Sequence, residues 1–248
     1  MQSSTAVTTH DRYYVPAPSI WPIVGSVALL TLAAGFVLLL QKVSAGAYIM
    51  GLGGIILAVM LVGWFGNVIR ENVAGLFNDQ VDLSYRWGMG WFIFSEVMFF
   101  GALFSALFYS RFWTIPVLGH TPLLWPGFIP DWPNAGPAAK EAFQPMHAWG
   151  IPAINTLILL SSGATVTWAH WGLKRNNRMQ VKIGLALTIL LGVVFLFLQA
   201  HEYMSAGFTL KTGIYGATFY ILTGFHGAHV TLGAIMLSVI LGRVMAGH

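Results

Sequence analysis

Six long apolar stretches constrain what this chain can fold into more than any other feature of its sequence. Each is close to or above the about 20 residues that a helix needs to cross a bilayer. Of the 248 residues 56% are hydrophobic and 8% are charged, whereas roughly a quarter are charged in a soluble domain. The sequence therefore predicts an all-α polytopic bundle of about six transmembrane helices in a single membrane domain, 1–248. The stretches are about 20–40, 46–69, 87–113, 151–172, 181–203 and 214–243.

The basic residues are topology signals rather than a binding patch. The net charge is +4, but the 12 Lys and Arg are scattered between apolar runs, which argues against a nucleic-acid partner. With no Cys, the chain cannot by itself build a disulfide framework, a thiolate metal site or an iron–sulfur cluster. Residues 1–4 lack the basic start of a secretory signal, so no removable signal peptide is predicted.

The distribution of Lys and Arg predicts that the N-terminus lies in the cytoplasm or matrix. This orientation puts eight basic residues inside and four outside, as the positive-inside rule requires. The inner ones are Arg12, Arg70, Arg86, Lys174, Arg175, Arg178, Lys182 and Arg243, and the outer ones are Lys42, Arg111, Lys140 and Lys211.

The longest connection, 114–150, lies outside in this topology. Seven of the 11 prolines fall in it, together with Trp125, Trp132 and Trp149. Proline removes a backbone donor and fixes φ, so an irregular segment on the membrane surface is predicted, with Trp at headgroup level. A loop of this length is commonly functional or covers a partner, but a plain spacer fits the sequence equally well.

Glu96 lies near the middle of the third stretch, within Phe92–Phe100. A carboxylate at that depth costs several kcal/mol if it is ionised and faces lipid. It must therefore face protein or water, or carry a proton. Two interpretations stay open: a proton-handling group, or a neutral acid that hydrogen-bonds a neighbouring helix.

His226 and His229 are three residues apart in the last stretch and so share one helical face. Neutral imidazole is a common metal or haem ligand, but a closed site needs further ligands. The other interpretation is interhelical hydrogen bonding, with Gly224 and Gly227 allowing close approach of a neighbouring helix. The spacing favours this structural polar packing.

Three further polar features mark ends of the stretches. His170 ends the fourth, Glu202 lies in the Gln199–Tyr203 segment that ends the fifth, and Arg70 and Glu71 end the second. Interfacial anchoring is a sufficient account of each. An Arg at this depth is also placed to meet a lipid phosphate.

Several segments resemble, in order, those of a known family. Over Pro18 to Arg243 the chain resembles subunit III of the haem-copper oxidases, in particular of cytochrome c oxidase. The segments are Pro18–Pro22, Val68–Glu71, Arg86–Met89, Ser95–Phe100, Asn155–Thr156 with Leu160–Gly163, Thr167–His170, Gln199–Tyr203, Phe208–Thr209, and Tyr215–Phe219 with Thr223–Val230.

The resemblance implies a non-catalytic core subunit of a proton-pumping terminal oxidase of aerobic respiration. Haem and copper belong to partner subunits, so this chain holds no catalytic residue and no metal ligand. It packs on subunit I, with subunit II also in the complex, and cytochrome c is the substrate of the complex. It stabilises subunit I and supports proton uptake.

The resemblance also implies bound phospholipid in a cleft beside the first two helices, which are splayed from the rest. Trp64, Arg70 and Glu71 correspond to cleft positions, and Arg243 to a basic residue that meets a lipid phosphate. Glu96 corresponds to the buried carboxylate of the third helix.

The chain departs from the family pattern in three places. The family usually has seven helices, and no counterpart of the seventh follows Arg243. Trp64-Phe65-Gly66-Asn67 stands where many members have Trp-Trp-Arg-Asp, and residues 72–85 lack a lipid-contacting His.

Other functions were weighed against this one. Because the first two helices are present, cytochrome c oxidase is favoured over a quinol oxidase, which often lacks them. A proton-coupled transporter using Glu96 and a haem-binding subunit using His226 and His229 are the remaining alternatives. A bacterial plasma membrane is the first choice of location, and a mitochondrial inner membrane is the second.

Overall fold

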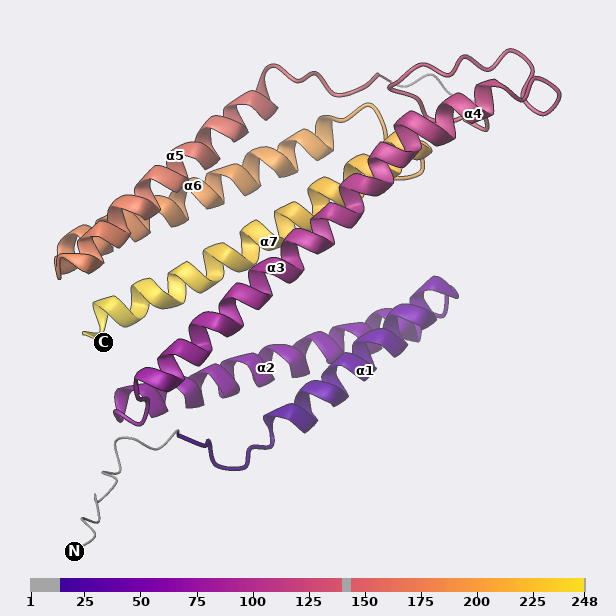
Figure 1. The fold of residues 1–248 in the computed structure, drawn as a ribbon. Coiled ribbons are helices and arrows are strands. Elements are labelled where there is room, and N and C mark those ends of the chain that lie inside the picture. Colours follow the sequence, from indigo (N-terminus) through magenta and orange to yellow (C-terminus); the bar gives the residue numbers. More distant parts are fainter. Residues whose placement is uncertain (1–13, 140–143, 248) are drawn as a thin grey trace, which may run out of the picture. The chain divides into compact units, whose positions relative to one another are not determined.

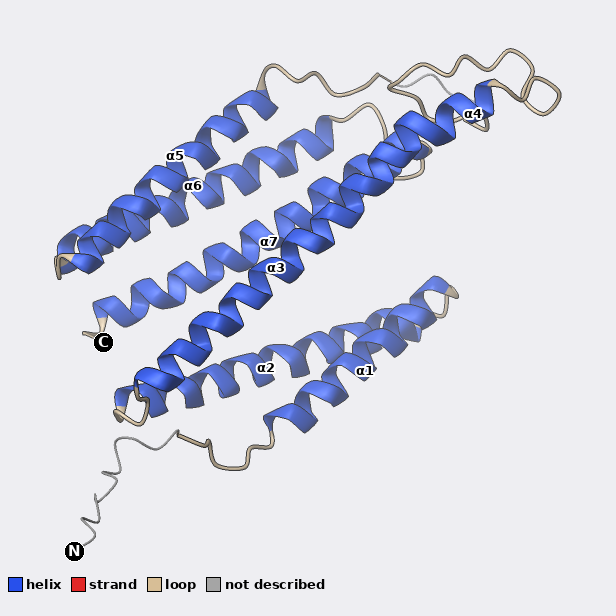
Figure 2. Cartoon of the chain, in the orientation of Figure 1, coloured by secondary structure: helices blue, strands red, loops and turns tan. Residues whose placement is uncertain are grey.

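The fold is entirely helical over the residues that the structure describes. A computed structural model places residues 14–139 and 144–247, and no strand occurs among them (Figures 1 and 2). Arg12 and Lys140, used above for topology, lie outside the described residues. The elements are α1 (Trp21–Leu40), α2 (Ala45–Val73), α3 (Asp79–Tyr109), η2 (Ser110–Thr114), α4 (Ile115–Gly119), α5 (Ile151–Lys174), α6 (Arg178–Ser205) and α7 (Ile214–Met245).

Six helical segments of the described chain are long and apolar enough to cross a membrane. They are α1, α2, the continuous segment Asp79–Gly119, α5, α6 and α7. The predicted all-α membrane fold with six spanning helices is confirmed. The chain divides into two compact units, Met1–Ile93 and Phe94–His248, with the boundary inside α3. The single membrane domain and the lipid cleft beside the first two helices stay predictions.

The third helical segment is longer than the apolar stretch 87–113. It begins at Asp79, because Asp79 and Asp82 suit the positive end of the helix dipole and the Asn78 side chain accepts from the Val81 N–H at 3.0 Å. At the other end the π-helical turn η2 and α4 continue it to Gly119, so the loop expected from residue 114 begins at His120. Pro116 is compatible with this continuation, since it occupies the first turn of α4, where a missing N–H costs little.

The unit Met1–Ile93 is built on a helical hairpin of α1 and α2, joined by residues 41–44 (Figure 1). Glycines bring the two backbones into contact. A Cβ on Gly53 of α2 would lie 2.7 Å from the Leu32 nitrogen of α1, and a Cβ on Gly35 of α1 would overlap the Met50 backbone. Small residues at a helix interface allow this approach, and dispersion contacts then hold the helices together without help from water.

The unit Phe94–His248 is organised around α6, which packs against α5 on one side and α7 on another (Figure 1). Ala169, Val181 and Leu185 form a buried cluster, against which Leu237 and Leu241 of α7 pack. Hydroxyl groups add a specific link, because Thr165 of α5 and Thr188 of α6 are 2.8 Å apart. The short α5–α6 connection is fixed by the Asn177 cap, which accepts from the Gln180 N–H at 3.2 Å.

Part of the long loop is anchored to the start of α7. The Ile214 N–H donates to the Ala135 carbonyl at 3.0 Å, and a Cβ on Gly213 would overlap that same oxygen. The Asn134 side chain shapes the turn by donating to Ile129 O at 3.0 Å and accepting from Gly136 N–H at 2.7 Å. This segment is therefore folded onto the helical unit near Ala135.

Candidate functional site

The half-buried acid of α3, Glu96, meets a histidine of α7. Nε2 of His229 lies 2.5 Å from Oε2 of Glu96, and 133 residues separate the two in sequence. The other imidazole nitrogen, Nδ1, lies 2.6 Å from the Phe225 carbonyl, one turn earlier in α7. Both nitrogens of His229 are therefore engaged, one with its own helix and one with α3.

The number of protons in this contact follows from hydrogen-bond chemistry. The Phe225 carbonyl can only accept, so Nδ1 of His229 must carry a hydrogen. The bond between Nε2 and Glu96 contains one further proton, on the nitrogen or on the oxygen. In both cases Glu96 and His229 together have no net charge, which removes the electrostatic cost of an isolated carboxylate in the membrane.

Aromatic rings surround the Glu96–His229 pair. The Phe100 ring centroid is 5.0 Å from that of His229, and the Phe99 centroid is 5.0 Å from that of Phe225. The Glu96 and His229 side chains are 32% and 34% exposed within this chain. Apolar rings exclude water from part of the bond, which strengthens the attraction between its partners.

His226 does not join His229 in a common site. Its ring packs edge-on against Phe195 of α6, with centroids 5.5 Å apart, while His229 turns to α3. Within residues 14–139 and 144–247, no group of three or more His, Cys, Asp or Glu side chains is placed to hold a metal ion. The nitrogens of His229 are also already used in hydrogen bonds, so ligation through this residue would break one of them.

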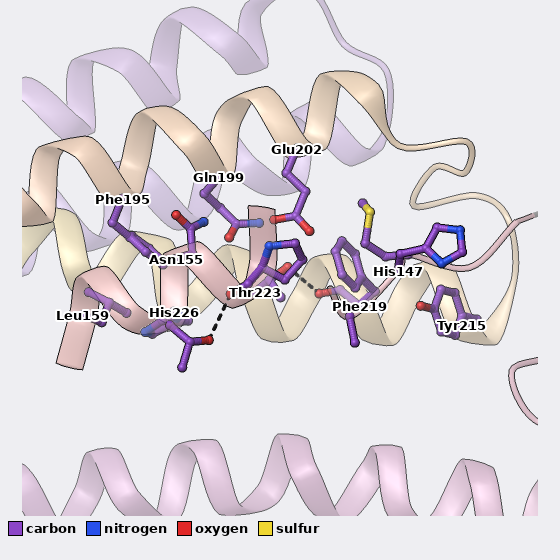
Figure 3. Close-up of a pocket in the computed structure, with 14 residues that line it drawn as sticks. His147, Asn155, Leu159, Phe195, Gln199, Glu202, Tyr215, Phe219, Thr223 and His226 are labelled. Carbon is purple, nitrogen blue, oxygen red and sulfur yellow. Dashed lines mark hydrogen bonds between the residues drawn. The ribbon is translucent and has the colours of Figure 1, made fainter. Parts of the chain in front are cut away.

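A second polar site lies between α5, α6 and α7, near the end of the unit where α5 begins and α6 ends. It is a cavity of about 340 Å³. Figure 3 shows Asn155, Gln199 and Glu202 grouped around it. Asn155 and Glu202 are 3% and 4% exposed, so the structure buries a carboxyl group that the sequence placed at a helix boundary. The polar part of the lining includes His147, Asn155, Gln199, Glu202, Thr223 and His226.

The other predicted site residues lie elsewhere. Trp64, Arg70 and Glu71 are on α2, where Arg70 donates to the Asn67 side chain three residues earlier. Arg243 is in the last turn of α7, where a positive charge suits the helix dipole. His170 is exposed on α5 and shares no site with the others.

Comparison with known proteins gives a single answer. Residues 10–248 match the family of cytochrome c oxidase subunit III. The chain belongs to the cytochrome c oxidase subunit III family. The cytochrome c oxidase subunit 3 of Prototheca wickerhamii is 40% identical over 95% of this chain and 84% of the relative. For the Drosophila melanogaster protein of the same name the identity is 38%, over 98% and 87%.

A relative from Rickettsia bellii is also 40% identical, over 100% of this chain and 86% of its own length. Relatives of the cytochrome c oxidase subunit III family thus occur in bacteria and in eukaryotes. Membership makes this chain a multi-pass membrane subunit III of a haem-copper oxidase, in a complex with other oxidase subunits of the respiratory chain.

Sequence reasoning singled out Glu96 and His229 separately but not their bond. Asn155 was noted only as part of a family segment, and its place in the cavity was missed. An Asn in the second turn of an apolar helix is a usable signal, since a buried amide needs hydrogen-bond partners. The residues that line the cavity with Asn155 come mainly from α5, α6 and α7, and sequence spacing does not register those helices against one another.

Proposed function

We propose that this chain is the non-catalytic core subunit III of a proton-pumping haem-copper terminal oxidase, which stabilises subunit I and supports proton uptake. Family membership supports the proposal. The observation that carries the non-catalytic part is the 2.5 Å bond between Glu96 and His229.

That bond suits holding helices together. The ring of His229 is fixed at both nitrogens, and the paired groups are neutral as a unit. A proton carrier must instead exchange its proton with a donor on one side and an acceptor on the other. Glu96 is therefore assigned as the polar link between α3 and α7.

The partners follow from this role. Subunit I is the main contact and subunit II lies in the same complex, with cytochrome c as the electron donor to the whole. Haem and copper belong to those partner subunits, where they supply oxygen reduction. A quinol oxidase subunit III is the alternative, distinguished by the reductant of the purified complex.

Phospholipid is the proposed ligand of this chain's own surface. The Arg70 guanidinium is held against α2 by the neutral Asn67 amide, so its positive charge is left to attract a lipid phosphate. Trp64, exposed on the same helix, suits the headgroup level, with Glu71 beside the Arg. Arg243 at the end of α7 is the second candidate for a phosphate contact.

The proposed location is a bacterial plasma membrane with the N-terminus in the cytoplasm, and a mitochondrial inner membrane is the alternative. The excess of basic residues on the inner side supports this orientation. Accessibility of the 175–177 and 206–213 connections to a membrane-impermeant label would test it.

Purification of the tagged chain in mild detergent tests the proposed function. Haem absorption in the eluate, with subunits I and II identified by mass spectrometry, is the expected result. Oxidation of reduced cytochrome c rather than quinol by the eluate would select the electron donor. A colourless chain without partners, from membranes with active oxidase, would overturn the proposal. Proton flux through that chain in liposomes, lost in Glu96→Gln, would then establish a transporter.

A further inference from the structure

The cavity between α5, α6 and α7 contains an unsatisfied amide. Both side-chain polar atoms of Asn155, Oδ1 and Nδ2, are buried and have no hydrogen-bond partner among the residues that the structure describes. A buried group left without a partner costs about 1–3 kcal/mol. The amide has two N–H donors and one carbonyl acceptor, so it calls for a ligand that both accepts and donates hydrogen bonds.

Glu202 lines the same cavity and offers further hydrogen-bonding capacity there. Its carboxyl group is buried, hydrogen-bonds the Gln199 side chain one turn earlier in α6, and makes no ion pair with any residue of the described chain. A carboxylate in this position would be an unpaired buried charge, which is costly, so burial favours the protonated carboxyl group. A protonated carboxyl offers one O–H donor and retains acceptor capacity.

The lining excludes most other ligands. Among the described residues, the lining contains no Lys or Arg to neutralise an anion, and no cluster of three acidic or imidazole groups is available for a metal ion. Leu159, Phe195 and Phe219 contribute apolar surface to the lining, and Asn155, Gln199 and Glu202 contribute polar groups to it. A small neutral molecule with both donors and acceptors fits this arrangement.

The volume fits several such molecules. The cavity measures about 340 Å³. Water occupies roughly 30 Å³ per molecule in the liquid, and a buried water typically makes about three hydrogen bonds. A cluster of waters in this volume can bond Asn155, Gln199 and Glu202 and can also bond within itself.

We propose that this cavity binds a cluster of water molecules anchored by Asn155, and that Glu202 exchanges its carboxyl proton with them. In the exchange, the O–H bond of Glu202 breaks as its proton passes to a water oxygen. A second water returns a proton to the carboxylate and is itself reprotonated from the first water through the hydrogen-bonded cluster, so every group ends with its starting charge. His226 lies at the edge shared with a neighbouring apolar cavity of about 530 Å³ lined by Phe100, Phe104 and Leu107, which bounds the water on that side.

Infrared spectroscopy of the protein in its complex tests the exchange. The C=O stretch of a protonated carboxyl group, identified by its loss in Glu202→Gln, should shift on transfer from H2O to D2O before the backbone amides of α6 exchange. Asn155→Leu should slow that shift about tenfold, because it removes the polar anchor of the water. Glu96→Gln is the matched control, since it alters the other membrane acid and should leave the band and its exchange rate unchanged.

A band that stays unshifted in D2O, or that persists in Glu202→Gln, would overturn the proposal. A high-resolution map of the unmodified protein provides a second measurement that needs no variant. Water density within hydrogen-bond distance of both Asn155 amide atoms is expected, and density for a lipid chain or another molecule there would contradict it. All the proposed water-binding groups belong to this chain. The infrared band and the water density can therefore be measured whichever subunits copurify, and their failure is distinct from failure of the proposed function.

Discussion

At the scale of single residues, the contact between Glu96 and His229 depends on one shared proton. The Phe225 carbonyl fixes the imidazole through Nδ1. Nε2 accepts a hydrogen bond when the ring is neutral and donates one when the ring is charged, so its partner must be able to donate or accept accordingly. A carboxylic acid adapts by donating and a carboxylate by accepting. An amide side chain adapts as well, because it has both an N–H and a carbonyl oxygen.

Glu96→Gln should therefore preserve the link between α3 and α7, whereas Glu96→Ala should weaken it. The alanine variant leaves Nε2 of His229 without a partner, at a cost of about 1–3 kcal/mol in the free energy of unfolding. Unfolding of the purified protein in mixed micelles, followed by intrinsic fluorescence, measures both. Equal and severe loss of assembly in the two variants would show that the acid itself is needed.

Sequence alone identified the residue types of this site and not their arrangement. A carboxyl group in the middle of an apolar helix can be recognised from the sequence as a candidate site, because placing it in the membrane interior costs free energy. His226 and His229 look alike at that level, since both lie on one face of α7. Only the contact of α3 with α7 distinguishes His229 from His226. The rotation of one helix relative to another cannot be predicted from the residue spacing within either helix.

At the scale of elements, the hairpin of α1 and α2 depends on where its glycines point. Gly53 and Gly54 are neighbours in α2, yet only Gly53 meets the backbone of α1, at Leu32. Nothing lies within 4 Å of a Cβ built on Gly54. The sequence predicts the same packing role for both glycines, and only the structure shows that Gly53 is the one that contacts α1.

Gly53→Ala should destabilise the α1–α2 hairpin by about 1–3 kcal/mol, because the added methyl group overpacks a tight interface. Gly54→Ala is the matched control and should be neutral. The fraction of hairpin crosslinked between engineered cysteines in α1 and α2, measured as detergent strength rises, compares the two. Similar behaviour of the two variants would contradict the assignment of Gly53 to the interface.

The α5–α6 pair should respond to loss of one hydroxyl group. Thr188→Val removes the 2.8 Å contact with Thr165 and should cost about 0.6 kcal/mol, typical of hydrogen bonds between membrane helices. Thr167→Val serves for comparison, because that hydroxyl group bonds the Gly163 carbonyl of its own helix. Unfolding free energies in mixed micelles give the difference, and a larger loss at Thr167 would argue against the interhelical role of Thr188.

The bounds of the elements were only partly predictable from the sequence. Apolar length located all six spanning helices, but charged residues near Asp79 and a proline at 116 gave the appearance of breaks. In the structure these residues occupy first turns of helices, where acidic side chains and proline are tolerated. Hydropathy identifies the residues that lie in the membrane interior, whereas the helices extend beyond those residues at either end.

At the scale of the whole molecule, family membership places this chain in a complex with other oxidase subunits, to which the proposed function assigns the chemistry. Two polar contacts join helices inside the bundle, Glu96 with His229 and Thr165 with Thr188. A scaffold of this kind contributes to the lifetime of a complex more than to its elementary reaction rate.

Deletion of this chain should leave the haem content of the oxidase largely intact and shorten the period over which it turns over. Haem absorbance per mole of subunit I and the time course of oxygen consumption measure these separately. The initial rate should fall less than the total number of turnovers before inactivation. Complete loss of haem while subunit I still assembles would contradict a non-catalytic role.

The bond between α3 and α7 also has a consequence in time. Synthesis proceeds from the N-terminus, so Glu96 enters the membrane while His229, 133 residues later, has yet to be made. During that interval the carboxyl group has no imidazole partner and its helix is poorly suited to lipid. Until α7 is inserted, the nascent chain therefore carries an unpaired carboxyl group within the membrane. A protease or chaperone that recognises a polar group in lipid can use this difference to distinguish an incomplete chain from a complete one.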